Sequence, residues 1–185
     1  GVSMKFCSMC GSSIDRLIPA GDNRERYVCS ASECGEIHYQ NPRIITGCLP
    51  IYKGQILLCK RAIEPRYGLW TLPAGFLENQ ETTQQGAERE SIEEANANLD
   101  IKGLYTIFDI PHINQVYFFY RAELVDTGFS AGIESLDVKL FNVEDIPWDE
   151  LAFPAIKKTL EYYIEDSKNQ HFKFRSELLE PSGIR

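Results

Sequence analysis

The 185-residue sequence has no long hydrophobic run and no N-terminal block of charged and then apolar residues. Its apolar stretches, such as Val116–Tyr120, are far shorter than the roughly 20 residues that a membrane-spanning helix needs. Because it shows no secretory signal pattern, we expect a cytoplasmic protein with no membrane partner. Gly1–Ser3 precede Met4, so we expect the native chain to start at Met4.

Positive charge is also scarce. The sequence has 19 Lys and Arg against 27 Asp and Glu, which gives a formal net charge of −8. This balance argues against a broad surface for binding nucleic acid. A carboxylate-rich site that binds an anionic substrate such as a phosphate ester would need metal ions between the two sets of negative charge.

Residues 5–40 contain too few apolar side chains to build a stable core without a cross-link such as a bound metal ion or a disulfide. Four of the six cysteines lie there, in two closely spaced pairs: Cys7, Cys10, Cys29 and Cys34. In a cytosolic chain such pairs favour metal binding over disulfides. Four thiolates suit tetrahedral Zn²⁺ and leave no open position for water, so we predict a structural zinc ion, with a disulfide or free thiols as the alternatives. Cys48 and Cys59 are expected to be small buried side chains.

After Asn41-Pro42 the sequence becomes richer in apolar residues and loses the closely spaced cysteines. Periodicity and turn residues predict strands at Ile44–Tyr52, Gln55–Lys60, Gly103–Asp109, Gln115–Leu124 and Val138–Asn142, and helices at Thr82–Ala95 and Pro154–Lys168. Gly68–Gly75 is predicted to be irregular. This order indicates an α/β (α+β) domain over residues 41–170, with a mixed sheet between helices. Residues 1–40 would form the small zinc-binding domain, and residues 171–185 a weakly ordered tail.

The predicted helix at Thr82–Ala95 carries three carboxylates on one face. Glu90, Glu93 and Glu94 are three and four residues apart and so project together from about one turn. Like charges this close destabilise a helix unless a counter-ion is present, and carboxylate oxygens are the ligands that Mg²⁺ and Mn²⁺ prefer. Bound cations would neutralise phosphoryl oxygens and activate water, as diphosphate hydrolysis requires. The alternative is a solvated charged helix face.

The spacing around these residues argues against that alternative. The pattern Gly-x5-Glu-x7-Arg-Glu-x-x-Glu-Glu, from Gly75 to Glu94, fixes six identities. At roughly 6% frequency per residue type, chance produces it on the order of once in ten million starting positions. The segment resembles the Nudix box. It departs from that box at Ser91, where an apolar residue is usual, and at Asn96, which replaces a closing glycine but tolerates the same left-handed backbone.

The resemblance implies a Nudix fold and assigns roles within the box. Glu90, Glu93 and Glu94 would bind the catalytic Mg²⁺ or Mn²⁺ together with the Gly75 carbonyl. Glu81 and Arg89 would form a structural pair.

Three further residues are candidates on chemical grounds. Trp70 could stack on a substrate ring or simply pack on the core. Arg61 could meet phosphate oxygens or form a surface salt bridge. Glu134 follows a flexible loop, a common place for functional residues, and could act as the general base or as another metal ligand.

A zinc ribbon joined to a Nudix box resembles two groups, NADH pyrophosphatases and FAD pyrophosphatase-like proteins. The runs Tyr39–Pro42, Leu58–Arg61, Trp70–Gly75, Glu134–Leu136 and Leu151–Phe153 resemble the second group. The resemblance therefore implies hydrolysis of a nucleotide-linked diphosphate, FAD to FMN and AMP first, ADP-ribose second and NADH as the alternative. A homodimer is compatible with this reading.

Three other functions remain as rivals. A non-catalytic nucleotide-sensing module would have lost carboxylates of the box, and none is lost here. An isopentenyl diphosphate isomerase would need a catalytic cysteine, which the apolar strand around Cys48 does not suggest. An RNA-decapping hydrolase is disfavoured by the acidic balance.

Overall fold

A computed structural model describes residues 3–181. It divides into two compact units, Gly1–Pro42 and Arg43–Arg185, with a border two residues after the predicted limit of the zinc-binding domain. No described helix is long and apolar enough to cross a membrane.

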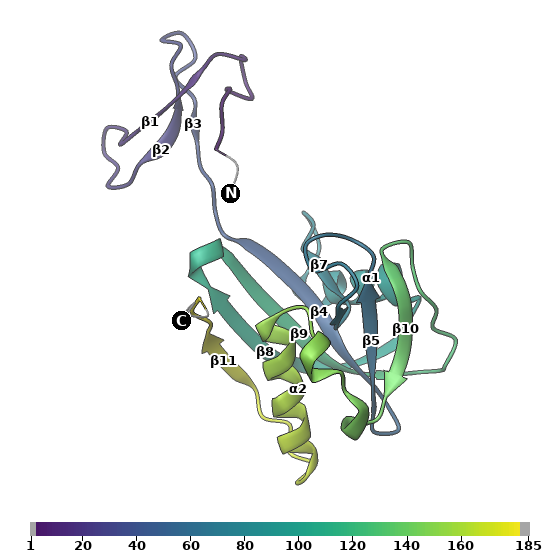
Figure 1. The fold of residues 1–185 in the computed structure, drawn as a ribbon. Helices are drawn as coiled ribbons and strands as arrows, with labels where there is room; N and C mark the ends of the chain where they lie inside the picture. The colour runs from purple at the N-terminus through teal and green to yellow at the C-terminus, as the bar shows by residue number, and fades with distance from the viewer. Residues whose placement is uncertain (1–2, 182–185) are drawn as a thin grey trace. The chain divides into compact units, whose positions relative to one another are not determined.

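The first unit is a small three-stranded antiparallel sheet (Figure 1) of β1 (Ile14–Leu17), β2 (Arg26–Cys29) and β3 (Ile37–His38). Among its described residues, the buried hydrophobic side chains are Cys7 and Cys29. So small an apolar core stabilises a fold of about 40 residues poorly, and the cysteines must supply the missing stabilisation.

The second unit is a mixed sheet of the strand order β10-β5-β4-β9-β8-β11, to which the short strands β6 and β7 add at β5 and β4. The β4–β9 and β8–β11 pairs are parallel and the others antiparallel. The strands are β4 (Arg43–Tyr52), β5 (Gln55–Arg61), β6 (Trp70–Thr71), β7 (Ala74–Phe76), β8 (Leu99–Ile110), β9 (Gln115–Leu124), β10 (Ser135–Phe141) and β11 (Arg175–Leu178). The predicted mixed sheet is confirmed.

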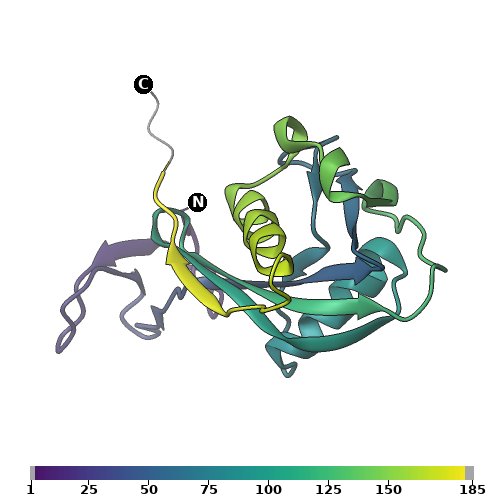
Figure 2. The same cartoon turned by 90° about the horizontal axis from the view of Figure 1, so that it is seen from below.

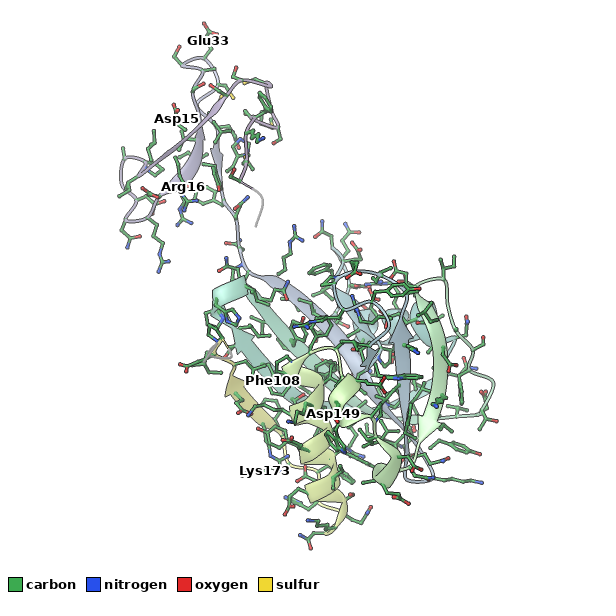
Figure 3. All side chains as sticks on the ribbon, viewed as in Figure 1. Asp15, Arg16, Glu33, Phe108, Asp149 and Lys173 are labelled. Atoms are coloured by element: carbon green, nitrogen blue, oxygen red, sulfur yellow. The ribbon has the colours of Figure 1, made fainter. Side chains whose placement is uncertain are left out.

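Two helices, α1 (Thr83–Ala95) and α2 (Pro154–Ser167), pack against opposite faces of this sheet (Figure 2). Short 3₁₀ turns are present at Pro111–Ile113, Val143–Asp145 and Trp148–Glu150. The main core lies between the sheet and α2 and includes Phe108, Phe119, Ile156 and Leu160, of which Phe108 is labelled in Figure 3. Cys48 and Cys59 are buried, as predicted.

Local sequence explains both ends of α1. The Thr82 hydroxyl accepts a hydrogen bond from the Gln85 amide (3.0 Å), and the Gln85 side chain accepts one from the Thr82 amide (2.8 Å), which is a complete capping box. The helix ends at Asn96, whose φ of 47° is left-handed, as expected for the residue that replaces glycine. Gly86 lies where α1 approaches β4, because a Cβ there would be 2.6 Å from Thr46 Cγ2.

Two predictions of the local structure are wrong. Gly68–Gly75 is not irregular throughout, since β6 and the start of β7 fall within it. The tail after residue 170 is not weakly ordered where β11 pairs in parallel with β8. The cause is an ion pair in which Arg175 donates to both oxygens of Asp166, at 2.7 and 2.6 Å. Residues 182–185 of the predicted tail lie outside the described part of the chain.

Candidate active site

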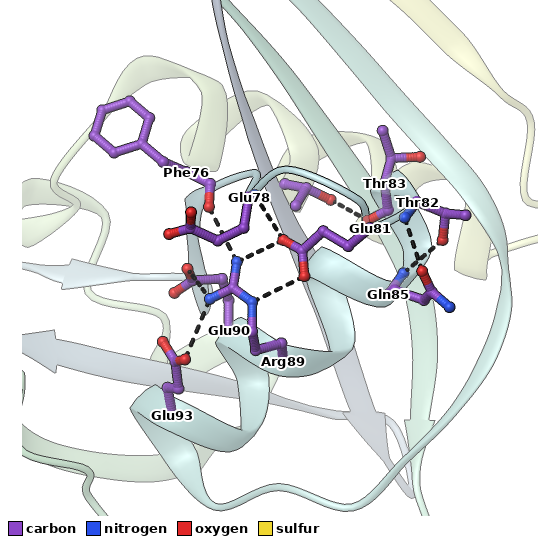
Figure 4. Close-up of polar contacts among 10 residues, drawn as sticks. Phe76, Glu78, Glu81, Thr82, Thr83, Gln85, Arg89, Glu90 and Glu93 are labelled. Atoms are coloured by element: carbon purple, nitrogen blue, oxygen red, sulfur yellow. Dashed lines mark hydrogen bonds and ion pairs between the residues drawn. The ribbon is translucent and has the colours of Figure 1, made fainter.

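Arg89 links the charged residues at the start of the site (Figure 4). Its guanidinium donates to both oxygens of Glu81, at 3.0 and 2.7 Å, and to the Phe76 carbonyl at 3.0 Å. It also reaches Glu90 (2.8 Å) and Glu93 (3.2 Å). Hydrogen bonds from Arg89 lower the pKa of Glu81 to about 2, so this pair stays ionised and ties the loop before α1 to the helix. The predicted Glu81–Arg89 pair is therefore present.

Glu90 and Glu94 project from α1 toward β7 and are buried, with 7% and 8% of their surface exposed. One oxygen of Glu94 accepts a hydrogen bond from the Ala74 amide at 3.1 Å. Burial raises the pKa of Glu94 to about 8, and the charges of Glu90 and Glu134 add to this effect. Burial also raises the pKa of Glu90, although Arg89 opposes the shift. Two ionised carboxylates that are this buried lose much of their hydration, which raises their free energy unless a cation lies beside them.

The glycine at position 75 is explained by its distance from Glu90. Gly75 pairs with Thr46 across the β4–β7 ladder, which holds its backbone against the helix. A Cβ at this position would lie 2.4 Å from each carboxylate oxygen of Glu90. Only glycine therefore lets the carboxylate approach the backbone of residues 74 and 75.

A loop from β9 to β10 wraps around the C-terminal end of α1 and brings Glu134 to the site. The Gly132 amide and the Ser135 hydroxyl both donate to the Glu94 carbonyl, at 3.0 and 2.9 Å. The loop approaches so closely that a Cβ on Gly132 would lie 1.8 Å from the Glu93 carbonyl oxygen. The charge of Glu134 raises the pKa of Glu90 and of Glu94, so its carboxylate lies near enough to act electrostatically on both members of this acidic cluster.

Arg61, at the end of β5, lies near enough to Glu94 for its charge to act on that carboxylate. Its Nε donates to the Pro65 carbonyl at 2.9 Å, and its guanidinium lies 5.1 Å from the centre of the Phe153 ring. Its charge lowers the pKa of Glu94. Within residues 3–181 it forms no ion pair at salt-bridge distance, so the structure does not have the surface salt bridge that was the alternative for Arg61.

Trp70 does not belong to the cluster. It is 6% exposed and packs edge to face against Phe141, with 4.9 Å between ring centres. Core packing was one of the two alternatives for Trp70, and its burial leaves little of the ring accessible for the other, stacking on a substrate ring. The hydrogen bond from the Ala74 amide to Glu94 could not be predicted from the sequence, because every residue except proline has a backbone N–H.

The donor set of the acidic cluster fits a hard divalent cation. Glu90 and Glu94 offer carboxylate oxygens beside residues 74 and 75, with the charge of Glu134 nearby, and oxygen is the donor that Mg²⁺ and Mn²⁺ require. Glu93, predicted as a ligand, is turned toward Arg89 and is largely exposed. A short rotation about its side-chain bonds would return it to the face that it shares with Glu90.

In the first unit, the four predicted cysteines form a second cluster. Their sulfur atoms all lie within 4.8 Å of one another, with Cys7 and Cys34 at 3.9 Å and Cys10 and Cys29 at 3.5 Å. Four thiolates at about 2.3 Å from a tetrahedral zinc ion would be about 3.8 Å apart, so the arrangement fits Zn²⁺. The amides of Met9 and Ala31 approach Cys7 and Cys29, each at 3.4 Å, as outer donors to metal-bound sulfur do.

Comparison with protein families agrees with both clusters. The NUDIX domain model matches residues 41–163, and the Nudix N-terminal zinc-ribbon model matches residues 5–40. The chain belongs to the Nudix hydrolase family.

Several proteins of this family, some of them with solved structures, are similar to this chain. The NUDIX hydrolase from Nitrosomonas europaea is 49% identical, with a TM-score of 0.90 over 95% of this chain and 99% of that one. The ADP-ribose pyrophosphatase of Methanocaldococcus jannaschii is 26% identical over 67% of this Nudix chain and 75% of its own length. The NAD-capped RNA hydrolase NudC of Yersinia enterocolitica is 29% identical over 52% of this chain, but the match spans only 34% of NudC.

Proposed function

We propose that this Nudix hydrolase cleaves the internal diphosphate of a nucleotide-linked substrate, with FAD converted by water to FMN and AMP, and ADP-ribose as a second substrate. The observation that carries the proposal is the pair of buried carboxylates, Glu90 and Glu94, beside Gly75. Divalent cations, when bound, would neutralise the diphosphate and lower the pKa of a water molecule.

The residues of the chain would take complementary roles. Glu90, Glu93 and Glu94 would hold the cations together with the Gly75 carbonyl. Glu134, on its loop at the end of α1, is proposed to take the proton from the attacking water or to serve as a further ligand.

Two residues outside this set would support the reaction. Arg61 would bind phosphate oxygens, since its guanidinium has no carboxylate partner at salt-bridge distance within the described residues and its charge acts on Glu94. Arg89 would hold the box in shape through its bonds to Glu81.

The choice of substrate rests on different observations. The runs from Tyr39–Pro42 to Leu151–Phe153 resemble the FAD-cleaving group and favour FAD. The names of two relatives favour ADP-ribose and an NAD-type compound, and NudC adds NAD-capped RNA. All of these contain an AMP moiety in an internal diphosphate, which is the feature that we propose the enzyme recognises.

A substrate panel with two matched variants tests the proposal. Wild-type protein is incubated with FAD, NADH, ADP-ribose, dinucleoside polyphosphates and NAD-capped RNA, each with Mg²⁺ and with Mn²⁺. Glu94→Gln keeps the side-chain shape but removes the charge, and we expect a loss of more than about 10²-fold. Glu88→Gln, on the same helix but outside the cluster, should remain near the wild-type rate.

Three results would count against the proposal. Glu94→Gln with over about a tenth of the wild-type rate would remove the metal role. Activity on no member of the panel would remove the function. Faster cleavage of NADH or ADP-ribose than of FAD would replace the substrate while keeping the chemistry.

A further inference from the structure

A half-open cavity of about 420 Å³ lies where the β4–β5 turn, the end of β9 and the segment after α2 meet. It is not the acidic cluster. Ile51, which lines it, is five residues along β4 from Thr46, the partner of Gly75 (51 − 46 = 5), or roughly 16 Å of strand. The cavity also lies toward α2, whereas the acidic cluster is built on α1, on the other face of the sheet (Figure 2).

Two cations line this cavity without a carboxylate partner. The Arg121 guanidinium lies 4.2 Å from the centre of the Phe172 ring, and the Lys53 ammonium lies 5.3 Å from that of Tyr52. Neither forms a salt bridge within the described residues. The lining carboxylate, Glu123, is 59% exposed at its side chain and lies 3.7 Å from the Lys102 ammonium. Arg121 and Lys53 therefore outnumber Glu123 among the charged residues that line the cavity, and this balance favours an anionic ligand.

Tyr163 adds an unused hydrogen-bond donor. Only 5% of this residue is exposed, and its ring is stacked on Phe172, with 5.8 Å between centres and 16° between planes. Its hydroxyl makes no hydrogen bond to residues 3–181 and is not a buried unpartnered atom, so the oxygen is accessible from the cavity that Tyr163 lines. Burial raises its pKa, the charge of Arg121 opposes the rise, and the charge of Glu123 adds to it. The hydroxyl is therefore held in place beside Arg121 with its donor free.

We propose that this cavity is a second site that binds a nucleoside monophosphate, apart from the hydrolytic centre. Arg121, Lys53 and the Tyr163 hydroxyl bind the phosphate monoester. Two cations and a neutral donor match a dianion with several acceptor oxygens better than they match a carboxylate, which carries one charge. The volume exceeds what a phosphate alone fills, and Ile51 and Tyr52 supply apolar wall for the base and sugar.

Titration calorimetry with the full zinc-loaded chain, in buffer without Mg²⁺ or Mn²⁺, tests the site with AMP as the probe. We expect a Kd below about 1 mM for the wild-type protein and the same value for Glu94→Gln. Arg121→Gln should weaken binding about tenfold or more, because a charge-assisted bond is lost. Tyr163→Phe removes no hydrogen bond within the described protein and should weaken binding by about two- to tenfold.

Control probes and a control variant separate this site from the hydrolytic centre and from non-specific attraction of anions. Lys157→Gln removes an exposed cation of α2 and should leave the Kd unchanged. Adenosine and inorganic phosphate should each bind at least about tenfold more weakly than AMP. The proposal is overturned if AMP does not bind, if Arg121→Gln and Tyr163→Phe bind as well as wild type, or if binding disappears in Glu94→Gln. Adenosine or phosphate alone binding as tightly as AMP would also overturn it.

Discussion

Replacing Gly75 by alanine should stop catalysis while leaving the fold intact. The backbone of Gly75 does not have a positive φ, so alanine is compatible with its conformation. The new Cβ would lie 2.4 Å from each carboxylate oxygen of Glu90, whereas ordinary contact begins at 3.4 Å. The carboxylate must therefore retreat by about 1 Å (3.4 − 2.4), and a misplacement of that size costs on the order of 10²-fold in rate.

The stability cost should be small because the colliding atoms are the far end of a flexible side chain. We expect the free energy of unfolding to change by less than about 1 kcal/mol. The assay is hydrolysis of the best substrate over a titration of Mg²⁺, with urea denaturation of the same preparation. Higher Mg²⁺ should recover part of the lost rate, since a displaced ligand weakens cation binding.

Gly132→Ala is the matched control, because we expect it to lower stability rather than to displace a metal ligand. There the Cβ would lie 1.8 Å from the backbone oxygen of Glu93, which cannot move without the end of α1. Overpacking of this kind costs about 1–3 kcal/mol of stability. If Gly75→Ala keeps more than about a third of the wild-type kcat/KM, or if it loses as much stability as Gly132→Ala, the inferred contact between backbone and Glu90 does not control catalysis.

Three further predictions concern the metal, the C-terminal strand and the bond cleaved. Zinc should copurify at one equivalent per chain and be absent from the Cys7→Ser/Cys29→Ser double variant, as metal analysis would show; a zinc-free wild type would refute the ribbon. Because hydrogen bonds from Arg175 lower the pKa of Asp166, their stabilisation is present above about pH 4 and is lost as the pH falls through the lowered folded value. Arg175→Gln should therefore raise the pH midpoint of acid unfolding, and an unchanged midpoint would contradict the assignment. Hydrolysis of FAD in ¹⁸O-water should label either AMP or FMN, and riboflavin as the first product would contradict cleavage of the internal diphosphate.

Features that depend on neighbouring residues were predictable from the sequence. The β4–β5 hairpin follows from Lys53-Gly54, whose φ angles of 48° and 79° are the left-handed values that a two-residue turn requires. The end of α1 at Asn96 follows in the same way, because the side chain tolerates that backbone. The convergence of Glu90 and Glu94 follows from helical spacing alone.

Features that depend on distant contacts were not predictable. The order of Arg175–Leu178 comes from the bond between Arg175 and Asp166 and from pairing with β8, which no local pattern encodes. The position of Trp70 depends on Phe141, 71 residues away (141 − 70 = 71), so the sequence left packing and stacking equally open. Arg89 was expected to pair with Glu81, but its reach to Glu93 depends on the fold of the preceding loop.

The strand β11 also changes the edge that the sheet presents to other copies of the chain. Itself an outermost strand of only four residues, it covers Thr106–Asp109 of β8, whose N–H and C=O groups would otherwise be free. Such an open edge is a template on which another chain can add a strand, and this is a common first step in aggregation. A protein shortened before Arg175 would expose that template, so truncated forms should be handled as aggregation-prone, whereas extensions after residue 181 leave the shield in place.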